Sequence, residues 1–99
     1  MKVYISGPIT DDTDHADKFA RAFMLLAKAR HEPVSPVLIG RELKYRMRRD
    51  PTWEEYMRED IKALVGCDGI FMLDGWEASS GARLEEHIAM RLDIKRIEL

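Results

Sequence analysis

The chain has 99 residues with 45% hydrophobic content, which suffices for one hydrophobic core and predicts a single domain over residues 1–99. Its formal net charge of −2 argues against a general nucleic-acid-binding protein, and its single cysteine, Cys67, excludes an internal disulfide and is typical of a reducing compartment. No apolar run approaches the roughly 20 residues of a membrane span, so we expect a cytoplasmic protein without a membrane partner, small enough to form a homodimer or a higher homo-oligomer.

The first predicted strand is Lys2–Ser6, a run of β-forming residues that the turn pair Gly7-Pro8 ends. An apolar run without alternation is typical of a strand buried on both faces, so we place it in the middle of a parallel sheet. A helix is predicted over residues 15–30, with Asp14 as its N-cap. Its apolar face is predicted from residues that recur every three or four positions, namely Ala16, Phe19, Ala20, Phe23, Met24 and Ala27.

A brief second strand is predicted over Glu32–Pro36, confined by its prolines. The segment that follows, residues 37–49, is dominated by positive charge, opposed only by Glu42. Its five cations are Arg41, Lys44, Arg46, Arg48 and Arg49. Two interpretations stay open for it: a solvated face of a helix or loop, or a basic flap that contacts a phosphate or a neighbouring subunit.

A second amphipathic helix is predicted over Pro51–Val65. Thr52 is its expected N-cap, with Glu55 at the spacing of a capping box, and Gly66 is a fitting stop. Its buried side is predicted to consist of Trp53, Tyr56, Met57, Ile61 and Leu64. Asp60 lies beside this apolar stripe, where a carboxylate needs a partner, and it is either a functional residue or a charge at the boundary of the core.

The stretch Cys67–Met90 reads as a short apolar strand over residues 70–73, a loop of turn formers, and a helix that runs to about Asp93. Leu84, Ile88 and Met90 are the predicted apolar positions of this helix, and residues 94–99 resemble a last short strand. Strands that alternate with helices predict an α/β fold: a three-layer sandwich, Rossmann- or flavodoxin-like, around a small parallel sheet of four to five strands.

The start of the last helix is the candidate active site, because ligands bind outside the carboxyl ends of the strands in an open α/β sheet. The N–H groups of Ser80, Gly81 and Ala82 are free to face an anion there, and Glu85 lies about one turn further along. No cluster of residues has metal-ligand spacing, and the P-loop and dinucleotide fingerprints are missing, so no metal or cofactor is expected.

With metal and cofactor chemistry not expected, the candidate reaction is one carried out by carboxylates. A carboxylate can attack an anomeric carbon and form a covalent glycosyl-enzyme that a second acceptor resolves. In this interpretation Glu85 is the nucleophile, Asp60 donates a proton or binds the leaving group, and the turn at Ser79–Gly81 holds the sugar or its phosphate. The alternative for Glu85 is an ordinary acid on a helix surface.

Three segments, in this order, resemble the nucleoside 2-deoxyribosyltransferase superfamily, especially its short phage and bacterial members of uncharacterised function and its nucleotide N-glycoside hydrolases. They are V-Y-I-S-G-P-I-T at residues 3–10, Y-M-R-E-D-I at residues 56–61, and residues 68–89. The resemblance implies that Glu85, in S-x-G-x-x-x-E, is the nucleophile that attacks C1 of the deoxyribose. It also implies that Asp60 lies near the leaving base and that Tyr4 helps to hold the nucleophile.

The resemblance further implies that Ser79 and Gly81 contact the sugar or its 5′-phosphate. A serine at position 79, where transferases of free nucleosides commonly carry an aspartate, is more similar to the phosphate-binding hydrolases. The electrostatics agree, since a hydroxyl and free N–H groups suit a phosphate dianion that a carboxylate would repel. Four further residues are grouped with these as substrate- or phosphate-binding: Ser6, Gly7, Pro8 and Ser80. Arg83 and Glu86 depart from the pattern, which has smaller or apolar residues there.

The leading hypothesis is cleavage or transfer of the N-glycosidic bond of a (deoxy)nucleoside 5′-monophosphate or nucleoside, by double displacement through Glu85. The expected partner is therefore a small nucleotide or nucleoside. Two alternatives stay open: a non-catalytic nucleotide-binding or sensing module on the same fold, and an interaction protein that keeps only the fold.

Overall fold

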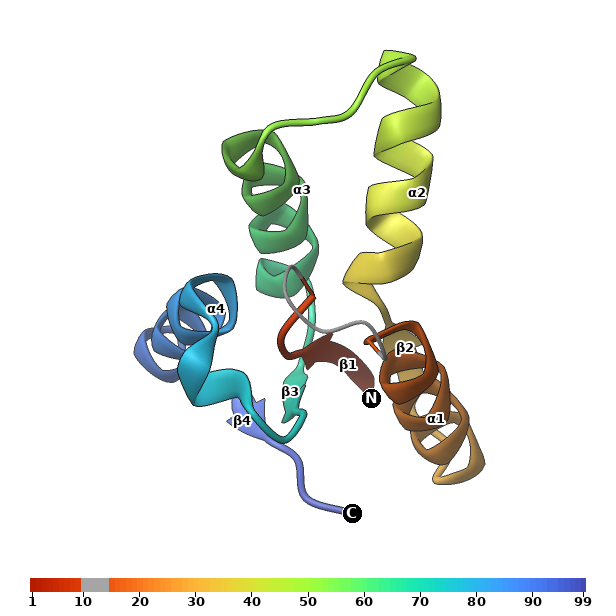
Figure 1. Cartoon of the computed structure of the whole chain (residues 1–99). Coiled ribbons are helices and arrows are strands. Elements are labelled where there is room, and N and C mark those ends of the chain that lie inside the picture. The colour runs from red at the N-terminus through yellow and green to blue at the C-terminus, as the bar shows by residue number, and fades with distance from the viewer. Residues whose placement is uncertain (10–14) are drawn as a thin grey trace.

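The structure, a computed structural model, describes residues 1–9 and 15–99 (Figure 1). Within these residues, four parallel strands form one sheet in the order β2-β1-β3-β4. The strands are β1 (Lys2–Ser6), β2 (Glu32–Val34), β3 (Gly69–Met72) and β4 (Lys95–Arg96). The helices are α1 (His15–Lys28), α2 (Pro36–Met47), α3 (Trp53–Val65) and α4 (Ser80–Arg91), with a short 3-10 turn, η1 (Trp76–Ala78), before α4.

Strands and helices alternate along the chain, which confirms the predicted α/β sandwich with a small parallel sheet. The expected N-cap Asp14 and the motif residue Thr10 lie outside the described residues. No helix in the described ranges is both long and apolar enough to cross a membrane.

Strand β1 lies in the middle of the core, because each of its two faces packs into a different hydrophobic cluster. Val3 and Ile5 pack against α1 on one face. Tyr4 packs with Leu64 of α3 and Ala89 of α4 on the other face. Successive side chains of a strand point to opposite faces, so the continuous apolar run of β1 is buried on both sides, as predicted. The sheet therefore lies between α1 and the α3–α4 layer.

The charged segment after β2 is a helix. Ser35 caps α2, and its hydroxyl accepts a hydrogen bond from the Val37 N–H at 3.3 Å. The predicted second strand is therefore too long at its end, because β2 stops at Val34. Figure 1 shows α2 and α3 standing side by side and joined at one end by residues 48–52. They approach closely at Gly40, where a Cβ atom would lie 3.0 Å from the Tyr56 ring.

The predicted start of α3 is confirmed. The Thr52 hydroxyl accepts from the Glu55 N–H at 3.2 Å, and the Glu55 carboxylate accepts from the Thr52 N–H at 2.9 Å. The predicted burial of Trp53 is wrong, because 46% of this residue is exposed. Its place at the first helical position leaves the indole at the edge of the layer.

Two predicted helix faces are only partly right. Phe19 of the predicted α1 face is buried and Phe23 packs against the core. In α1 the buried residues are Phe19, Ala22 and Leu26, whereas four residues of the predicted face are exposed: Ala16, Ala20, Met24 and Ala27. The charged residues of α1 gather on one side of the helix, and the opposite side packs on the sheet. The three- and four-residue spacing of apolar residues alone does not single out that side. In α4 the predicted positions Leu84 and Met90 are exposed and Ile88 is only partly buried. The buried residues of α4 are Ala82, Glu85 and Ala89, so this helix packs through small side chains and a carboxyl group.

Candidate active site

A cleft of about 910 Å³ opens at the carboxyl ends of β1 and β3. The chain passes from β1 to β2 on one side and returns to β3 on the other, so the strand order reverses beside β1. Ligands of open α/β sheets bind at this type of reversal. The walls come from six parts of the chain: the segment after β1, the start of α1, α2, α3, the segment that leads into α4, and the first turns of α4.

Glu85 lies on the cleft lining with only 4% of the residue exposed, and two hydroxyl groups of β1 hold it. The Tyr4 hydroxyl donates to Oε2 and the Ser6 hydroxyl donates to Oε1, each at 2.6 Å. Tyr4 and Ser6 are two residues apart on a strand, so both point to the face that α4 covers. Each carboxylate oxygen therefore has its own donor, and the carboxyl group is fixed in orientation.

Two effects act on the pKa of Glu85 in opposite directions. Burial raises the pKa of the Glu85 carboxyl above its usual value, while the hydrogen bonds from Ser6 and Tyr4 pull the pKa down. Burial, followed by the nearby charges of Glu85 and Asp60, raises the pKa of Tyr4 well above 10. Tyr4 therefore stays protonated at neutral pH and remains a donor to Glu85.

Asp60 is the second carboxyl group of the cleft. It is 6% exposed, and within the described part of the chain its Oδ1 atom is buried without a hydrogen-bond partner. Burial, then the charge of Glu85, then that of Glu59, raises the pKa of Asp60 to about 8. Asp60 is therefore largely protonated at neutral pH. The structure brings Asp60 and Glu85, from different helices, to the same cleft, as expected from the sequence.

The start of α4 forms another part of the lining, through Ser79, Ser80 and Gly81. Ser79 is the N-cap, and its hydroxyl accepts from the Ala82 N–H at 3.2 Å. The Ala82 N–H is thus already used, contrary to the expectation that it is free for an anion. Ser80 and Gly81 occupy the first two helical positions, whose N–H groups have no acceptor within a helix.

The other predicted binding residues divide into two groups. Gly7 and Pro8 line the cleft. Gly7 also has a packing role, because a Cβ atom there would lie 2.8 Å from the Leu73 Cβ. Ser6 is completely buried beneath Glu85, so it positions the carboxylate.

The basic segment is mostly neutralised. Three of its cations form ion pairs with acids: Lys44 with Asp50 at 3.0 Å, Arg46 with Glu59 at 2.9 Å, and Arg49 with Glu55 at 2.7 Å. Within the described ranges, Arg41 of α2 and Arg83 of α4 have no ion-pair partner, and both line the cleft. The cleft thus combines two buried carboxyl groups with two unpaired guanidinium groups.

Arg41, which one interpretation of the sequence placed in a basic flap that contacts a phosphate or a neighbouring subunit, faces the cleft. Sequence reasoning missed the part of the lining that the first turn of α3 provides. Trp53 and Tyr56 face the cleft there, although neither was predicted as a site residue. Their spacing relative to Asp60 was the available signal, since residues 53, 56 and 60 fall on one face of a helix. Among the described residues, no group of three or more histidine, cysteine, aspartate or glutamate side chains is arranged to hold a metal ion.

Removal of the Tyr4 hydroxyl by Tyr4→Phe is expected to destabilise the fold by about 1–3 kcal/mol, because it leaves the buried Oε2 of Glu85 without its donor. Urea unfolding at pH 7 measures the change. Tyr45→Phe is the matched control, since the Tyr45 residue is 85% exposed. Equal stability of the two variants would show that the Tyr4–Glu85 hydrogen bond contributes nothing.

The fold and cleft define a small α/β protein with two buried carboxyl groups at the carboxyl ends of its strands. A family model described as "Domain of unknown function (DUF4406)" matches residues 1–97, and the chain belongs to this family. No relative was found among curated proteins.

Proposed function

We propose that the protein cleaves or transfers the N-glycosidic bond of a (deoxy)nucleoside 5′-monophosphate or nucleoside, with Glu85 as the nucleophile. The observation that carries this proposal is the pairing of two unlike carboxyl groups at one cleft. Glu85 is held by two hydroxyl donors, and Asp60 is kept neutral by burial. Burial raises the pKa of both groups, but only Glu85 has hydroxyl donors that favour its charged form. The pair therefore suits a reaction that needs one nucleophile and one acid.

The first displacement joins a Glu85 oxygen to C1 of the sugar while the bond from C1 to the base nitrogen breaks. The electron pair of that bond goes to the base, and Asp60 donates its proton to the leaving base. Tyr4 and Ser6 keep the Glu85 oxygens in position during the attack.

The second displacement returns the enzyme to its starting state. The Asp60 carboxylate takes a proton from water, the water oxygen bonds to C1, and the bond between C1 and Glu85 breaks with its electron pair returning to Glu85. In a transferase a second base replaces water as the acceptor. We favour the hydrolase, acting on a 5′-monophosphate.

The phosphate preference is supported by the start of α4. The N–H groups of Ser80 and Gly81, which donate to no acceptor in the described part of the chain, lie at the positive end of the helix dipole. They line the cleft together with the Arg83 side chain. The hydroxyl of Ser79 adds no negative charge there, unlike an aspartate. A dianionic group beside these residues leaves the sugar within reach of Glu85, which follows Gly81 by about one helical turn.

The test is release of free base from dAMP, dGMP, dCMP and dTMP, and from the corresponding nucleosides, by purified protein and measured by liquid chromatography. We expect release from at least one monophosphate, and faster release than from its nucleoside. Absence of release from all of them would contradict the enzymatic proposal. Tight nucleotide binding in calorimetry without turnover would then support the alternative of a nucleotide-binding or sensing module.

A further inference from the structure

Trp53 is more exposed than is usual for a large apolar side chain. It is one of two tryptophans in the chain, and 46% of it is accessible although the indole is the largest apolar side chain available for burial. Trp53 lines the cleft, together with Tyr56, Met57 and Asp60 of the same helix. A half-exposed aromatic ring on a cleft wall points to a ligand surface.

The backbone beneath this ring is held firmly. Trp53 is the first residue of α3, directly after the Thr52–Glu55 capping box. The Glu55 carboxylate is in turn bound by both terminal nitrogens of Arg49, at 2.8 and 2.7 Å. The loop and the helix start are thus tied together, so the indole is presented from a fixed position.

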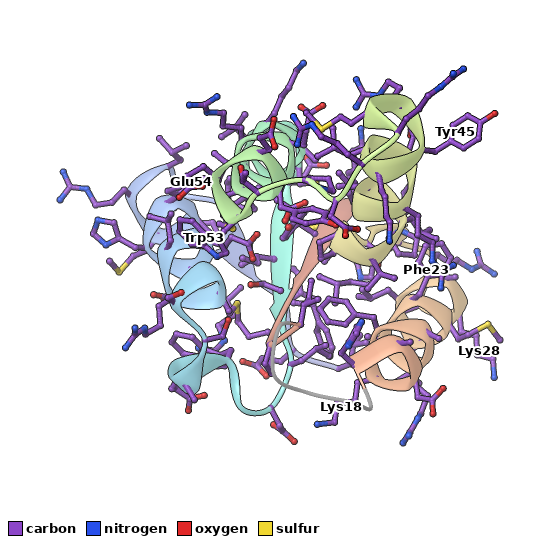
Figure 2. The ribbon with its side chains drawn as sticks, turned by 45° about the horizontal axis from the view of Figure 1, so that its top comes forward. Lys18, Phe23, Lys28, Tyr45, Trp53 and Glu54 are labelled. Atoms are coloured by element: carbon purple, nitrogen blue, oxygen red, sulfur yellow. The ribbon has the colours of Figure 1, made fainter. Side chains whose placement is uncertain are left out.

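The nitrogen edge of the indole is turned toward α4. The Nε1 atom lies 3.9 Å from the position that a Cβ atom of Gly81 would occupy, and the Met57 sulfur lies 3.2 Å from that position. Figure 2 shows Trp53 where the start of α3 meets α4, whereas Tyr45 points away from the molecule on the outer side of α2. One edge of the ring therefore rests against the helix that carries Glu85, and the rest stays accessible.

The distance along α3 suits a nucleotide. Residues 53 and 60 lie on one helix face, and seven residues of helix rise about 10 Å. Asp60 marks the deep end of this wall and Trp53 its outer end. Arg41 and Arg83, which form no ion pair with any described residue, line the same cleft. An aromatic wall beside unpaired cations is complementary to a flat ring that carries a phosphate.

We propose that Trp53 is a substrate-binding residue, whose indole stacks on the aromatic base of a nucleotide in the cleft. This inference rests on the proposed function for the kind of ligand, but it requires binding only and no bond cleavage. Stacking on an aromatic side chain tolerates any base, so Trp53 contributes affinity for the base ring and little discrimination between bases.

The two tryptophans allow a direct test by fluorescence. Trp76→Phe leaves Trp53 as the single tryptophan, and Trp53→Phe leaves Trp76, which is outside the cleft lining and has the Arg96 guanidinium 5.6 Å from its ring centre. Both are combined with Glu85→Gln so that the nucleotide is not consumed. We expect saturable quenching of Trp53 by at least one of dAMP, dGMP, dCMP and dTMP, no comparable quenching of Trp76, and no quenching by deoxyribose 5-phosphate.

A binding measurement separates stacking from a packing role. In calorimetry, Trp53→Leu keeps an apolar cover over Met57 but is expected to weaken nucleotide binding about tenfold or more, while Trp53→Phe retains most of the affinity. If Trp53→Leu fails to fold, the quenching measurement still tests whether Trp53 stacks on the base.

Three outcomes would overturn the inference: equal quenching by deoxyribose 5-phosphate, nucleotide binding without quenching of Trp53, or no binding of any of the four nucleotides. Failure of the proposed function is distinguishable from these. If the wild-type protein releases no base but a nucleotide quenches Trp53, the stacking site is supported and the enzymatic proposal is contradicted. If base is released but Trp53 is not quenched, the enzymatic proposal is supported and the stacking site is contradicted.

Discussion

Glu85→Gln is expected to lower kcat for base release by on the order of a thousandfold or more, with little change in substrate binding. Gln keeps the size and shape of the side chain. Its single amide oxygen accepts a hydrogen bond from Tyr4 or Ser6, and its amide nitrogen can donate to the other hydroxyl. Its amide oxygen is a poor nucleophile, so the covalent intermediate does not form. The measurement is kcat and KM for the best monophosphate found in the base-release assay.

Glu86→Gln is the matched control for this variant. Glu86 is the next residue of α4 and is outside the lining of the cleft, so its replacement removes one negative charge from the same helix without touching the reaction. We expect nearly wild-type kcat from it. If Glu85→Gln kept more than a small fraction of wild-type activity, Glu85 would not be the nucleophile and the double displacement would have to be abandoned.

Asp60→Asn is expected to lower kcat by about 10²–10⁴-fold, because the amide cannot donate a proton to the leaving base. The pH profile carries the more specific prediction. Wild-type activity should fall as the pH rises through about 8, where Asp60 loses its proton, and fall on the acid side as Glu85 becomes protonated. The two groups interact, so these limbs report apparent values of the pair. Any activity left in Asp60→Asn should lack the alkaline limb.

The same substitution is expected to stabilise the fold at high pH. The pKa of Asp60 is raised in the folded protein, so its contribution to stability is fully present below the unfolded pKa and is lost as the pH rises through about 8. Asn carries no charge to bury. We therefore expect the stability advantage of Asp60→Asn over wild type to grow between pH 5 and pH 8.5, by on the order of 1–3 kcal/mol.

Urea unfolding at both pH values measures this advantage, with the exposed Asp74→Asn as the control for loss of a carboxylate. Parallel pH dependence of wild type and Asp60→Asn would mean that Asp60 does not hold a proton in the folded state. In that case it would not be available as the acid in the proposed reaction, even if the cleft binds nucleotide.

Some features of the fold were predictable because their causes are local. The capping box of α3 needs only Thr52 and Glu55 at the right spacing, and the end of β1 needs only the Gly7-Pro8 turn pair. The order of strands and helices follows from such signals. The packing faces of α1 and α4 did not follow from the spacing of apolar residues. Exposed alanines of α1 share that spacing, and α4 packs through two alanines and Glu85.

The candidate site also has features that local sequence predicts and features that it does not. The position of Ser79–Gly81 at a helix start was predictable, since it depends on local sequence. The use of the Ala82 N–H by the Ser79 hydroxyl, and the place of Trp53 on the cleft wall, depend on side-chain direction, which residue spacing does not specify.

The sequence by itself determined the order of the strands and helices, the caps, and the identity of the acids that stand at a strand end or on a helix. The tertiary structure alone decided that Glu85 is buried against Tyr4 and Ser6, which precede it in the chain by 81 and 79 residues. It alone also decided that the Oδ1 atom of Asp60 is buried without a hydrogen-bond partner among the described residues, and that the pKa of this carboxyl group is raised to about 8. The physical reason is that burial and hydrogen bonding set the charge of a carboxyl group, and both depend on groups that are neighbours in space and remote along the chain.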